Sequence, residues 1–375
     1  MTRIMSRTFL ITLMSGALFG GYPHQVIAAD GNNEKPTTAG VQESWGEVSA
    51  TQDDPAAVSA FWSYSKMKAA EELEPSDVPP SLPGQPDHRY CPGIGECPDG
   101  DTAPSDFFGY LPAATPYEAN LLTRVNGILF FVADQFFPTL PDVPRHCSAS
   151  VIQSQGRSLV LTAAHCIKGG NEWSTNLLFV PAYNGSLPEA ARAPYGKWVV
   201  KRAYLPDFFL QTSNDIAVLS VYPQQGPDGE PVYLQDAVHG GLVPRPNDVE
   251  DTFPLVHIYG YPGNNWNGKD EPLADRTGKL SFCLSTSKSN DSFLLNTPNC
   301  GMQVGNSGGP SIIVHENSSI EPPEVVATVY NSQANARLLK ANFCPIYRAA
   351  DQDAAVIDPD AVCLPQTGTS GSSHR

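Results

Sequence analysis

The sequence predicts an all-β fold made of short antiparallel strands, arranged either as barrels or as a sandwich. The chain of 375 residues contains 31 glycines and 35 prolines, and only 17% of its residues are charged. Such a turn-rich composition suits many short strands better than long helices. From Asn126 onward, short apolar runs alternate with glycine, proline and asparagine, which is the texture of strands joined by tight turns.

Eleven candidate strands follow one another in this part of the chain. They are residues 127–132, 148–152, 158–163, 176–180, 197–203, 216–222, 255–260, 278–284, 292–295, 310–314 and 325–330. Residues 340–357 are the best helix candidate of the second half, because the run stops at Asp358-Pro359. No period indicates a repeat array.

Residues 1–29 resemble an export signal. Arg3 and Arg7 precede an apolar run over residues 9–19, and Ala28 and Ala29 supply small residues at a cleavage point. The run is too short to span a bilayer, so we expect a cleaved secretory signal peptide rather than the alternative, a membrane anchor. The protein is then expected to be secreted (extracellular), with no membrane association after signal removal.

The charge balance and the cysteines fit an extracellular protein. Without the signal, 21 basic residues face 39 acidic ones, which disfavours nucleic acid and anionic membranes as partners. Eight cysteines behind an export signal indicate disulfides rather than metal ligands, and no C-x-x-C or H-x-x-x-H spacing occurs. Eight cysteines allow 105 pairings, so composition alone assigns none of them.

Residues 30–124 are interpreted as an acidic pro-region, with a solvated acidic linker as the alternative. Residues 30–120 hold 16 acidic and 4 basic side chains and many prolines, so most of the segment should be extended or disordered. Residues 58–73 are the exception, since their apolar spacing suits a short amphipathic helix. Cys91 and Cys97 border a small loop that they could close.

Residues 305–310, Gly-Asn-Ser-Gly-Gly-Pro, carry the strongest chemical signal. Glycines on the C-terminal side leave the Ser307 hydroxyl unobstructed, and they let the backbone turn so that the amides of Gly305 and Ser307 converge as an oxyanion hole. An ordinary turn between two strands is the alternative. A serine hydroxyl is inert without a base, so a base must come from elsewhere in the chain.

Two upstream motifs supply the missing partners. His165 follows a predicted strand in Leu-Thr-Ala-Ala-His-Cys and directly precedes Cys166, a setting that would hold a general base still. Asp215 stands at the mouth of the apolar strand Ile-Ala-Val-Leu, where a buried carboxylate could orient an imidazole. Taken singly, each motif has a structural alternative; together they give the order His165, Asp215, Ser307.

Three motifs resemble those of chymotrypsin-like (trypsin-fold) serine endopeptidases. They are Thr-Ala-Ala-His-Cys at 162–166, Asn-Asp-Ile-Ala-Val at 214–218 and Gly-Asn-Ser-Gly-Gly-Pro at 305–310. The texture is closest to the secreted microbial trypsin-like peptidases. The resemblance implies a protease domain over residues 125–367, followed by a disordered tail at 368–375. It also implies two six-stranded antiparallel barrels, with His165 and Asp215 from the first and Ser307 and the oxyanion amides from the second.

The same resemblance implies two disulfides, Cys147 with Cys166 and Cys283 with Cys300. The pairs Cys344–Cys363 and Cys91–Cys97 are what then remains. Asn306 replaces the aspartate that captures a new N-terminus in animal zymogens, so activation need not follow that route. We nevertheless expect processing near Arg124, at the border of the pro-region.

Substrate preference is where the sequence is least informative. Gly301 stands where trypsin-like selectivity for Lys and Arg would need an acid. Val329 stands where glutamate-selective relatives usually carry a histidine. Asn331 and Ser332 are expected to continue the pocket wall, which favours a small or apolar residue at the cleaved bond.

We therefore expect a secreted serine endopeptidase, a monomer acting on a protein or peptide substrate through His165, Asp215 and Ser307. The alternative function is a non-catalytic binding protein that retains the fold. A narrowly specific processing enzyme is a third possibility, which differs from the general endopeptidase in substrate and not in mechanism. The chemistry needs no metal or organic cofactor, although a structural calcium remains open. Asn184, Asn290 and Asn317 begin sequons that matter only in a eukaryotic secretory pathway.

Overall fold

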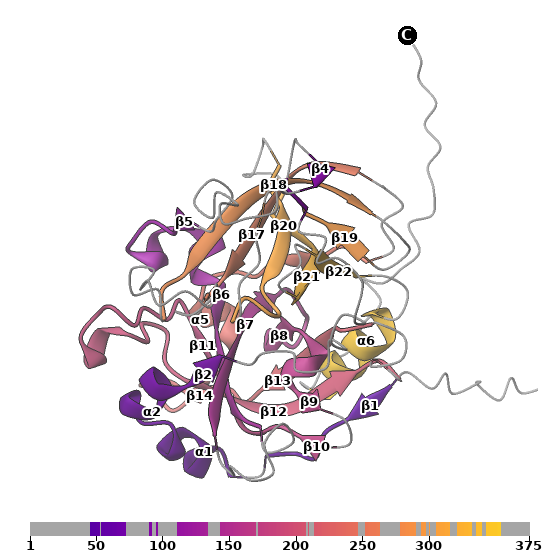
Figure 1. Cartoon of the computed structure of the whole chain (residues 1–375). Coiled ribbons are helices and arrows are strands. Elements are labelled where there is room, and N and C mark those ends of the chain that lie inside the picture. The colour runs from indigo at the N-terminus through magenta and orange to yellow at the C-terminus, as the bar shows by residue number, and fades with distance from the viewer. Residues whose placement is uncertain are drawn as a thin grey trace, which may run out of the picture. The chain divides into compact units, whose positions relative to one another are not determined.

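The fold is seen in a computed structural model of the chain (Figure 1). The residues that the structure describes are 46–52, 54–72, 90–91, 95–96, 111–133, 143–169, 172–207, 209, 214–246, 252–262, 278–289, 294–297, 300, 305–315, 321–331, 335–339 and 343–353. The expected signal peptide, the loop closed by Cys91 and Cys97, and the tail at 368–375 lie wholly or partly outside this set. Among the described residues, no helix is both long and apolar enough to cross a membrane.

Six antiparallel strands close into a first barrel. They are β6 (Asn126–Val132), β7 (Pro144–Ile152), β8 (Leu159–Thr162), β11 (Thr175–Pro181), β12 (Trp198–Leu205) and β13 (Ala217–Val221). The ring runs β12-β11-β6-β7-β8-β13, and a pairing of β12 with β13 closes it. Every side chain of β6, β8 and β13 is buried, because each of these strands carries an almost continuous apolar run.

A second barrel follows the same plan. Its strands are β17 (Thr252–Gly260), β18 (Ser281–Ser289), β19 (Leu294–Asn296), β20 (Pro310–Ile313), β21 (Glu324–Asn331) and β22 (Asn335–Leu338). The ring runs β21-β20-β17-β18-β19-β22 and closes through a pairing of β21 with β22. The short strands β5 (Leu111–Pro112) and β16 (Val243–Pro244) add to β18 and β21 from outside the ring.

The predicted fold class, two six-stranded antiparallel barrels with a C-terminal helix, is confirmed by these rings. All eleven predicted strands are strands in the structure, with shifted ends. Strand β22 was not predicted, because Asn-Ala-Arg-Leu has no run of β-branched or aromatic residues; its pairing with β19 and β21 makes it a strand.

Several shorter elements complete the described structure. The two-residue strands are β3 (Tyr90–Cys91), β4 (Gly95–Glu96), β9 (Lys168–Gly169), β10 (Glu172–Trp173), β14 (Gln224–Gln225) and β15 (Pro231–Val232). The short helices are α3 (Leu121–Arg124) and α5 (Leu234–Ala237), together with three-residue 3-10 turns at Tyr117–Ala119, Ala164–Cys166 and Glu189–Ala191. β3, β4, the turn at Tyr117–Ala119 and α3 precede the first barrel in the chain, and the others lie between barrel strands.

The C-terminal helix α6 (Phe343–Asp353) packs against the first barrel. Its Asp351 carboxylate accepts hydrogen bonds from the main-chain N–H groups of Gln155 and Gly156. Asp353 accepts from Lys201 and from the Ser220 hydroxyl. Burial alone would raise the pKa of Asp353, but these hydrogen bonds outweigh it and lower the pKa. The end of α6 is therefore fixed to the barrel that carries the candidate base.

Residues 46–72 wrap the first barrel and are called the amino-terminal strap. The strap contains β1 (Glu47–Val48) on β12, the helices α1 (Pro55–Phe61) and α2 (Tyr64–Ala69), and β2 (Glu71–Glu72) on β7. Trp62, between the helices, is fully buried, packs against Phe130 with the two rings tilted by 41°, and donates from its indole Nε1 to the carbonyl of Asn176. This buried anchor makes the strap part of the folded unit.

The strap corrects one expectation from the sequence. Residues 58–73 do not form one helix, because Ser63 caps a second helix by accepting from the N–H of Lys66. Residues 46–52 and 54–72 are a folded part of the segment 30–124, most of which was expected to be extended or disordered. Gln52 explains part of this order, since its side-chain amide bonds the main chain of both Leu177 and Val200.

Candidate active site

His165 sits in the 3-10 turn Ala164–Cys166, directly after β8. The next residue, Cys166, forms a disulfide with Cys147 on β7. The turn is thus fixed on both sides, by the strand before it and by the covalent bond after it. The side chain of His165 is 12% exposed, so one edge of the ring reaches solvent or a ligand.

Asp215 contacts His165 through both carboxylate oxygens. Oδ1 accepts a 2.7 Å hydrogen bond from the main-chain N–H of His165, and Oδ2 lies 2.6 Å from the imidazole Nδ1. Asp215 is buried and directly precedes Ile216 and strand β13, which pairs with β8 and so brings the acid beside the base. With Asp215 ionised, Nδ1 carries the proton and Nε2 presents a lone pair.

Ser307 lies in a turn between Cys300 and β20, and only 4% of its surface is exposed. Cys300 is joined by a disulfide to Cys283 on β18, so the turn begins from a fixed point. Gly305 and Gly308 adopt φ values of +89° and +80°, which L side chains rarely take. Glycine is therefore required on both sides of the Asn306-Ser307 pair.

The Ser307 turn is held against the first barrel by Ser148 of β7. The N–H of Ser148 donates a 2.8 Å hydrogen bond to the carbonyl of Ser307, and its hydroxyl donates to the carbonyl of Gly305. The same hydroxyl accepts from the N–H of Tyr261, which follows β17. A Cβ on Gly308 would lie 2.8 Å from the N of Ala163, so the turn packs tightly against the end of β8.

The amides of Gly305 and Ser307 donate no hydrogen bond to any described residue. Nε2 of His165 is buried and likewise has no hydrogen-bond partner there. His165 Nε2 and Ser307 Oγ are not hydrogen-bonded to each other, but an oriented imidazole with a free lone pair and a serine in a glycine-rich turn are the parts of a nucleophile and its base. Unengaged amides in the same turn are the groups that an oxyanion would use.

The family comparison agrees with this geometry. Residues 147–318 match the family model of the trypsin-like peptidase domain. The match covers the candidate catalytic residues His165, Asp215 and Ser307. It also covers the disulfides Cys147–Cys166 and Cys283–Cys300. No curated protein matches the chain in sequence.

Solved structures with a similar course of chain include two microbial proteases and one human protein. Protease Anisep from Arthrobacter nicotinovorans is 24% identical, with a TM-score of 0.47 over 61% of this chain and 96% of its own. The thermostable serine protease AL20 from an extremophilic microorganism is 20% identical, with a TM-score of 0.48 over 62% and 99%. Human heparin binding protein is 14% identical, with a TM-score of 0.41 over 63% and 92%.

The expected substrate-binding residues of the peptidase domain are described only in part. Gly301 and Ser332 lie outside the described residues, and Asn331 is the last residue of β21. Val329 is buried, and its main chain bonds the nucleophile turn, since its carbonyl accepts from Gly308 and its N–H donates to Gly309. Strand β21 therefore runs beside Ser307, as a wall of a substrate pocket would.

Asn306, the residue before Ser307, is fully buried and both of its side-chain amide atoms lack a hydrogen-bond partner among the described residues. A Cβ on Gly260 would lie 2.5 Å from its Oδ1, so only a glycine fits opposite it.

Arg124, the expected processing point, donates from its guanidinium to the carbonyls of Val238 and His239. The following residue, Val125, is fully buried, so the peptide bond between Arg124 and Val125 does not lie in an exposed loop.

One group of described side chains has the size of a metal site, namely Cys147, His165 and Cys166, whose ligand atoms lie within 4.8 Å of one another. Both sulfurs belong to a disulfide and offer no thiolate, so the group does not fit a metal ion.

Cys344 is also disulfide-bonded, while its expected partner Cys363 lies outside the described residues. Asn184, which begins one sequon, is buried and accepts from Ser186, a position unsuited to glycosylation of the folded chain.

Sequence reasoning missed Ser148 and the strap residue Glu47. Glu47 pairs with Lys168, three residues after His165, and so ties the strap to the loop that holds the base. The only sequence signal at Ser148 was a polar residue within an apolar strand, which is common at a barrel surface. Both roles depend on contacts between distant segments, which no local pattern reports.

Proposed function

We propose that the chain is a secreted serine endopeptidase that hydrolyses peptide bonds through Ser307, His165 and Asp215. The observation that carries the proposal is the double contact of Asp215 with His165, which leaves Nε2 buried and without a hydrogen-bond partner among the described residues. A purely structural histidine would have both ring nitrogens satisfied.

The reaction follows the acyl-transfer scheme of this arrangement. Ser307 Oγ attacks the scissile carbonyl while Nε2 of His165 takes its proton, and the Gly305 and Ser307 amides hold the oxyanion. His165 then returns the proton to the leaving amine, which departs and leaves an acyl group on Ser307. Water, deprotonated by His165, attacks the ester and releases the acid with the proton returned to Ser307. Asp215 orients the ring and stabilises the imidazolium.

Turnover of a protein substrate by the intact chain and by its Ser307→Ala variant tests the proposal. The variant should lose hydrolysis while keeping its thermal unfolding temperature, since only one buried oxygen atom is removed. Ser311→Ala is a matched control, because Ser311 is buried four residues further on and its hydroxyl has no partner among the described residues. Hydrolysis by Ser307→Ala at the rate of the unmodified chain would refute the assignment.

A non-catalytic binding protein that retains the fold is the competing function. Proteins of that kind usually lack at least one catalytic residue, whereas here His165, Asp215 and Ser307 are all present and the first two are in contact. A fluorophosphonate probe distinguishes the two functions, because it reacts only with an activated serine.

We further propose secretion, with the signal at residues 1–29 and disulfides formed in an oxidising compartment. We also keep processing near Arg124 as a proposal, with one condition. Because Arg124 ends α3 and Val125 is buried, this segment must open before a protease can reach the bond. N-terminal sequencing of the secreted protein locates the cut, and an active form that begins near Asp30 would exclude it.

A further inference from the structure

Lys168, the third residue after His165, carries a largely buried positive charge. Its side chain is 10% exposed, and its ammonium lies 5.0 Å from the centroid of the Trp173 ring. The carboxylate of Glu47, in the strap, forms an ion pair with this ammonium. Among the described residues, no other acidic side chain pairs with Lys168. Removing one partner of a buried ion pair leaves an uncompensated charge, so the loop after the base depends on the strap.

A short hairpin connects this ion pair to the turn that holds the base. Strand β9 begins at Lys168 and pairs with β10. Ser174, which directly follows β10, donates from its N–H to the carbonyl of Ile167 at 2.7 Å and from its hydroxyl to the carbonyl of Cys166 at 3.1 Å. Cys166 directly follows His165 in the chain. The hairpin thus supports the base turn from its C-terminal side, and the ion pair supports the hairpin.

Glu47 itself is placed by the main chain of the strap. It belongs to β1 and stands opposite Leu205 of β12. Two residues further on, Ser49 donates from its N–H to the carbonyl of Ala203, and its hydroxyl accepts from the N–H of Ala203 at 3.0 Å. A Cβ on Gly46 would lie 1.8 Å from the carbonyl oxygen of Leu205, so the start of the strap lies directly on β12. The carboxylate therefore reaches the ammonium from a fixed strand.

The middle of the strap adds further contacts with the first barrel. The Lys197 ammonium donates to the carbonyl of Trp62, and the Tyr222 hydroxyl donates to the carbonyl of Gln52. Together with the buried indole of Trp62 and the side-chain amide of Gln52, these contacts give the strap hydrogen-bond partners on and beside β11 and β12.

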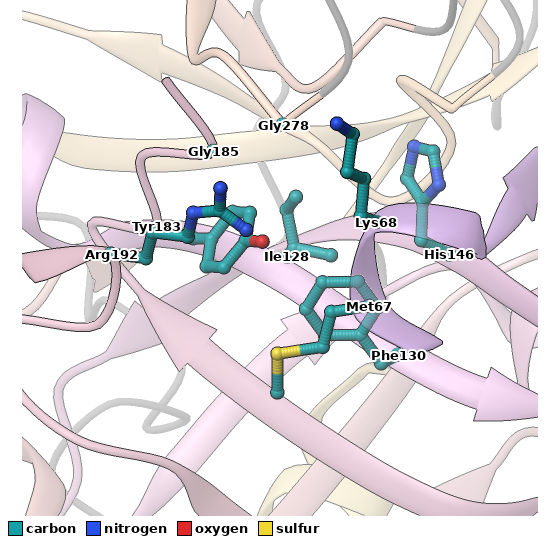
Figure 2. A pocket seen from close by; sticks show the side chains of 9 residues that line it. All are labelled: Met67, Lys68, Ile128, Phe130, His146, Tyr183, Gly185, Arg192 and Gly278. Carbon is teal, nitrogen blue, oxygen red and sulfur yellow. The ribbon is translucent and has the colours of Figure 1, made fainter. Parts of the chain in front are cut away.

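The second helix of the strap, α2, is packed less completely than the middle. A cavity of about 70 Å³, large enough to admit water, lies beside it (Figure 2). Among the residues that line this cavity are Met67, Lys68, Ile128, Phe130 and Tyr183. The fixed points on which binding of the strap depends are therefore β1, Gln52 and Trp62, which precede α2 in the chain.

No disulfide is expected between the strap and the barrels. Cys91 and Cys97 are the only cysteines between residues 30 and 124, and the sequence predicts that they pair with each other. If the chain is cut between the strap and β6, non-covalent contacts alone decide whether the strap leaves.

We propose that the strap stays bound after such a cut, so that the processed enzyme consists of two chains, and that Glu47 positions His165 through Lys168. The inference rests on the proposed function. Glu47 is a positioning residue, because it acts on the base through Lys168 and the hairpin. Part of the segment 30–124 is then a permanent component of the catalytic unit.

The first experiment introduces a site for a specific protease into residues 78–86, a proline-rich run outside the described residues. After the cut, size-exclusion chromatography in native buffer should show the strap fragment eluting with the barrels, and hydrolysis of a peptidyl anilide should be unchanged. Trp62→Ala in the same cut chain should release the fragment, since the buried anchor is lost. Phe61→Ala is the matched control and should retain it, because Phe61 is only partly buried.

Synthetic peptides with the sequence of residues 44–73 test the positioning role. Added at saturating concentration to the Trp62→Ala chain from which the fragment has been removed, the natural peptide should restore kcat. The same peptide with Glu47→Gln should still bind through Gln52 and Trp62, but kcat should stay lower by roughly ten- to a hundredfold, as for a catalytic group misplaced by up to about 1 Å. KM should be the same with both peptides.

The intact chain gives a measure that does not depend on release of the fragment. Glu47→Gln should lower kcat by a similar factor while KM and the far-UV circular dichroism spectrum stay unchanged. Glu172→Gln is the matched control, because Glu172 belongs to β10 of the same hairpin, is exposed and forms no ion pair with a described residue. It should leave kcat unchanged.

Loss of the strap fragment from the cut chain with hydrolysis unchanged would overturn its retention. Equal kcat values for the intact chain and its Glu47→Gln variant would overturn the positioning role. If the intact chain neither hydrolyses the anilide nor reacts with a fluorophosphonate, the proposed function fails instead, whereas elution of the fragment with the barrels still reports on retention.

Discussion

The main-chain N–H of Ser148 donates a 2.8 Å hydrogen bond to the carbonyl oxygen of Ser307. Ser148 belongs to β7 of the first barrel, and Ser307 stands between β19 and β20 of the second. The turn that carries the candidate nucleophile is thus fixed by a strand of the barrel that carries the candidate base. The relative position of Ser307 and His165 depends on this contact as much as on either loop.

Ser148→Ala should lower both stability and turnover. The substitution leaves the N–H of Tyr261 without its acceptor and the carbonyl of Gly305 without its donor, in a buried position. An unpaired buried group costs about 1–3 kcal/mol, so the free energy of unfolding in urea should fall by roughly that amount. Ser287→Ala is the control, since its buried hydroxyl has no partner among the described residues and its loss should cost little. Equal losses in the two variants would contradict this role of Ser148.

Asp215→Asn should lower kcat by about 10⁴, the usual loss for this change in a Ser-His-Asp triad, while the fold persists. The amide oxygen still accepts from the N–H of His165, but the NH₂ group then faces Nδ1. Nδ1 must become the acceptor, so Nε2 carries the proton and no longer acts as a base. Steady-state hydrolysis and thermal unfolding of the same preparation separate the two effects. A kcat within tenfold of the unmodified chain would count against the assignment.

Trp62→Ala should destabilise the first barrel by about 3–5 kcal/mol, the usual cost of truncating a buried aromatic residue. Trp62 is fully buried and donates to Asn176, whereas its neighbour Phe61 is only partly buried. Phe61→Ala is therefore the matched control and should cost clearly less. Chemical denaturation of both variants measures the difference. Similar small losses would show that the strap is dispensable for the fold, as a removable linker would be.

Acidification should destabilise the protein through His146. Burial lowers the pKa of His146 in the folded chain, so the unfolded chain takes up a proton at a higher pH. The free energy of unfolding should be constant above the ordinary histidine range and fall below it, by at most about 1.4 kcal/mol per pH unit for one proton. The fall should end once the pH passes below the lowered folded pKa.

Urea denaturation at about pH 7.5 and about pH 5.5, on either side of the ordinary histidine pKa, checks this slope. His146→Gln cannot titrate, so its slope should be smaller by the contribution of one proton. Burial also lowers the pKa of His257, which remains in the variant, so some slope should persist. An identical slope in the variant and the unmodified chain would exclude His146 as a source.

The sequence predicted the barrels well because their strands have continuous apolar runs, as in Leu-Val-Leu-Thr of β8. Strand β22 was not predicted, because Asn-Ala-Arg-Leu becomes a strand only through its pairing with β19 and β21. The docking of the strap was not predicted for a related reason. The acidic, proline-rich composition of residues 30–120 indicates disorder, yet within the strap one residue, Trp62, is buried on the first barrel in a way that no local pattern reveals.

The candidate site was predicted through short motifs whose order carries information, since His165, Asp215 and Ser307 each follow a recognisable local signal. Ser148, Glu47 and β2 were not predicted, because each acts on a segment far away in the chain. Substrate preference remained open for a further reason: Gly301 and Ser332 give no charged signal.

The central claim is that Ser307 is a nucleophile activated by His165, and mass spectrometry of the fluorophosphonate-treated chain tests it most directly. A single adduct should appear on the peptide that contains Ser307, should be absent from Ser307→Ala, and should form far more slowly in His165→Ala. An adduct on another serine, or labelling of Ser307→Ala at the rate of the unmodified chain, would contradict the claim.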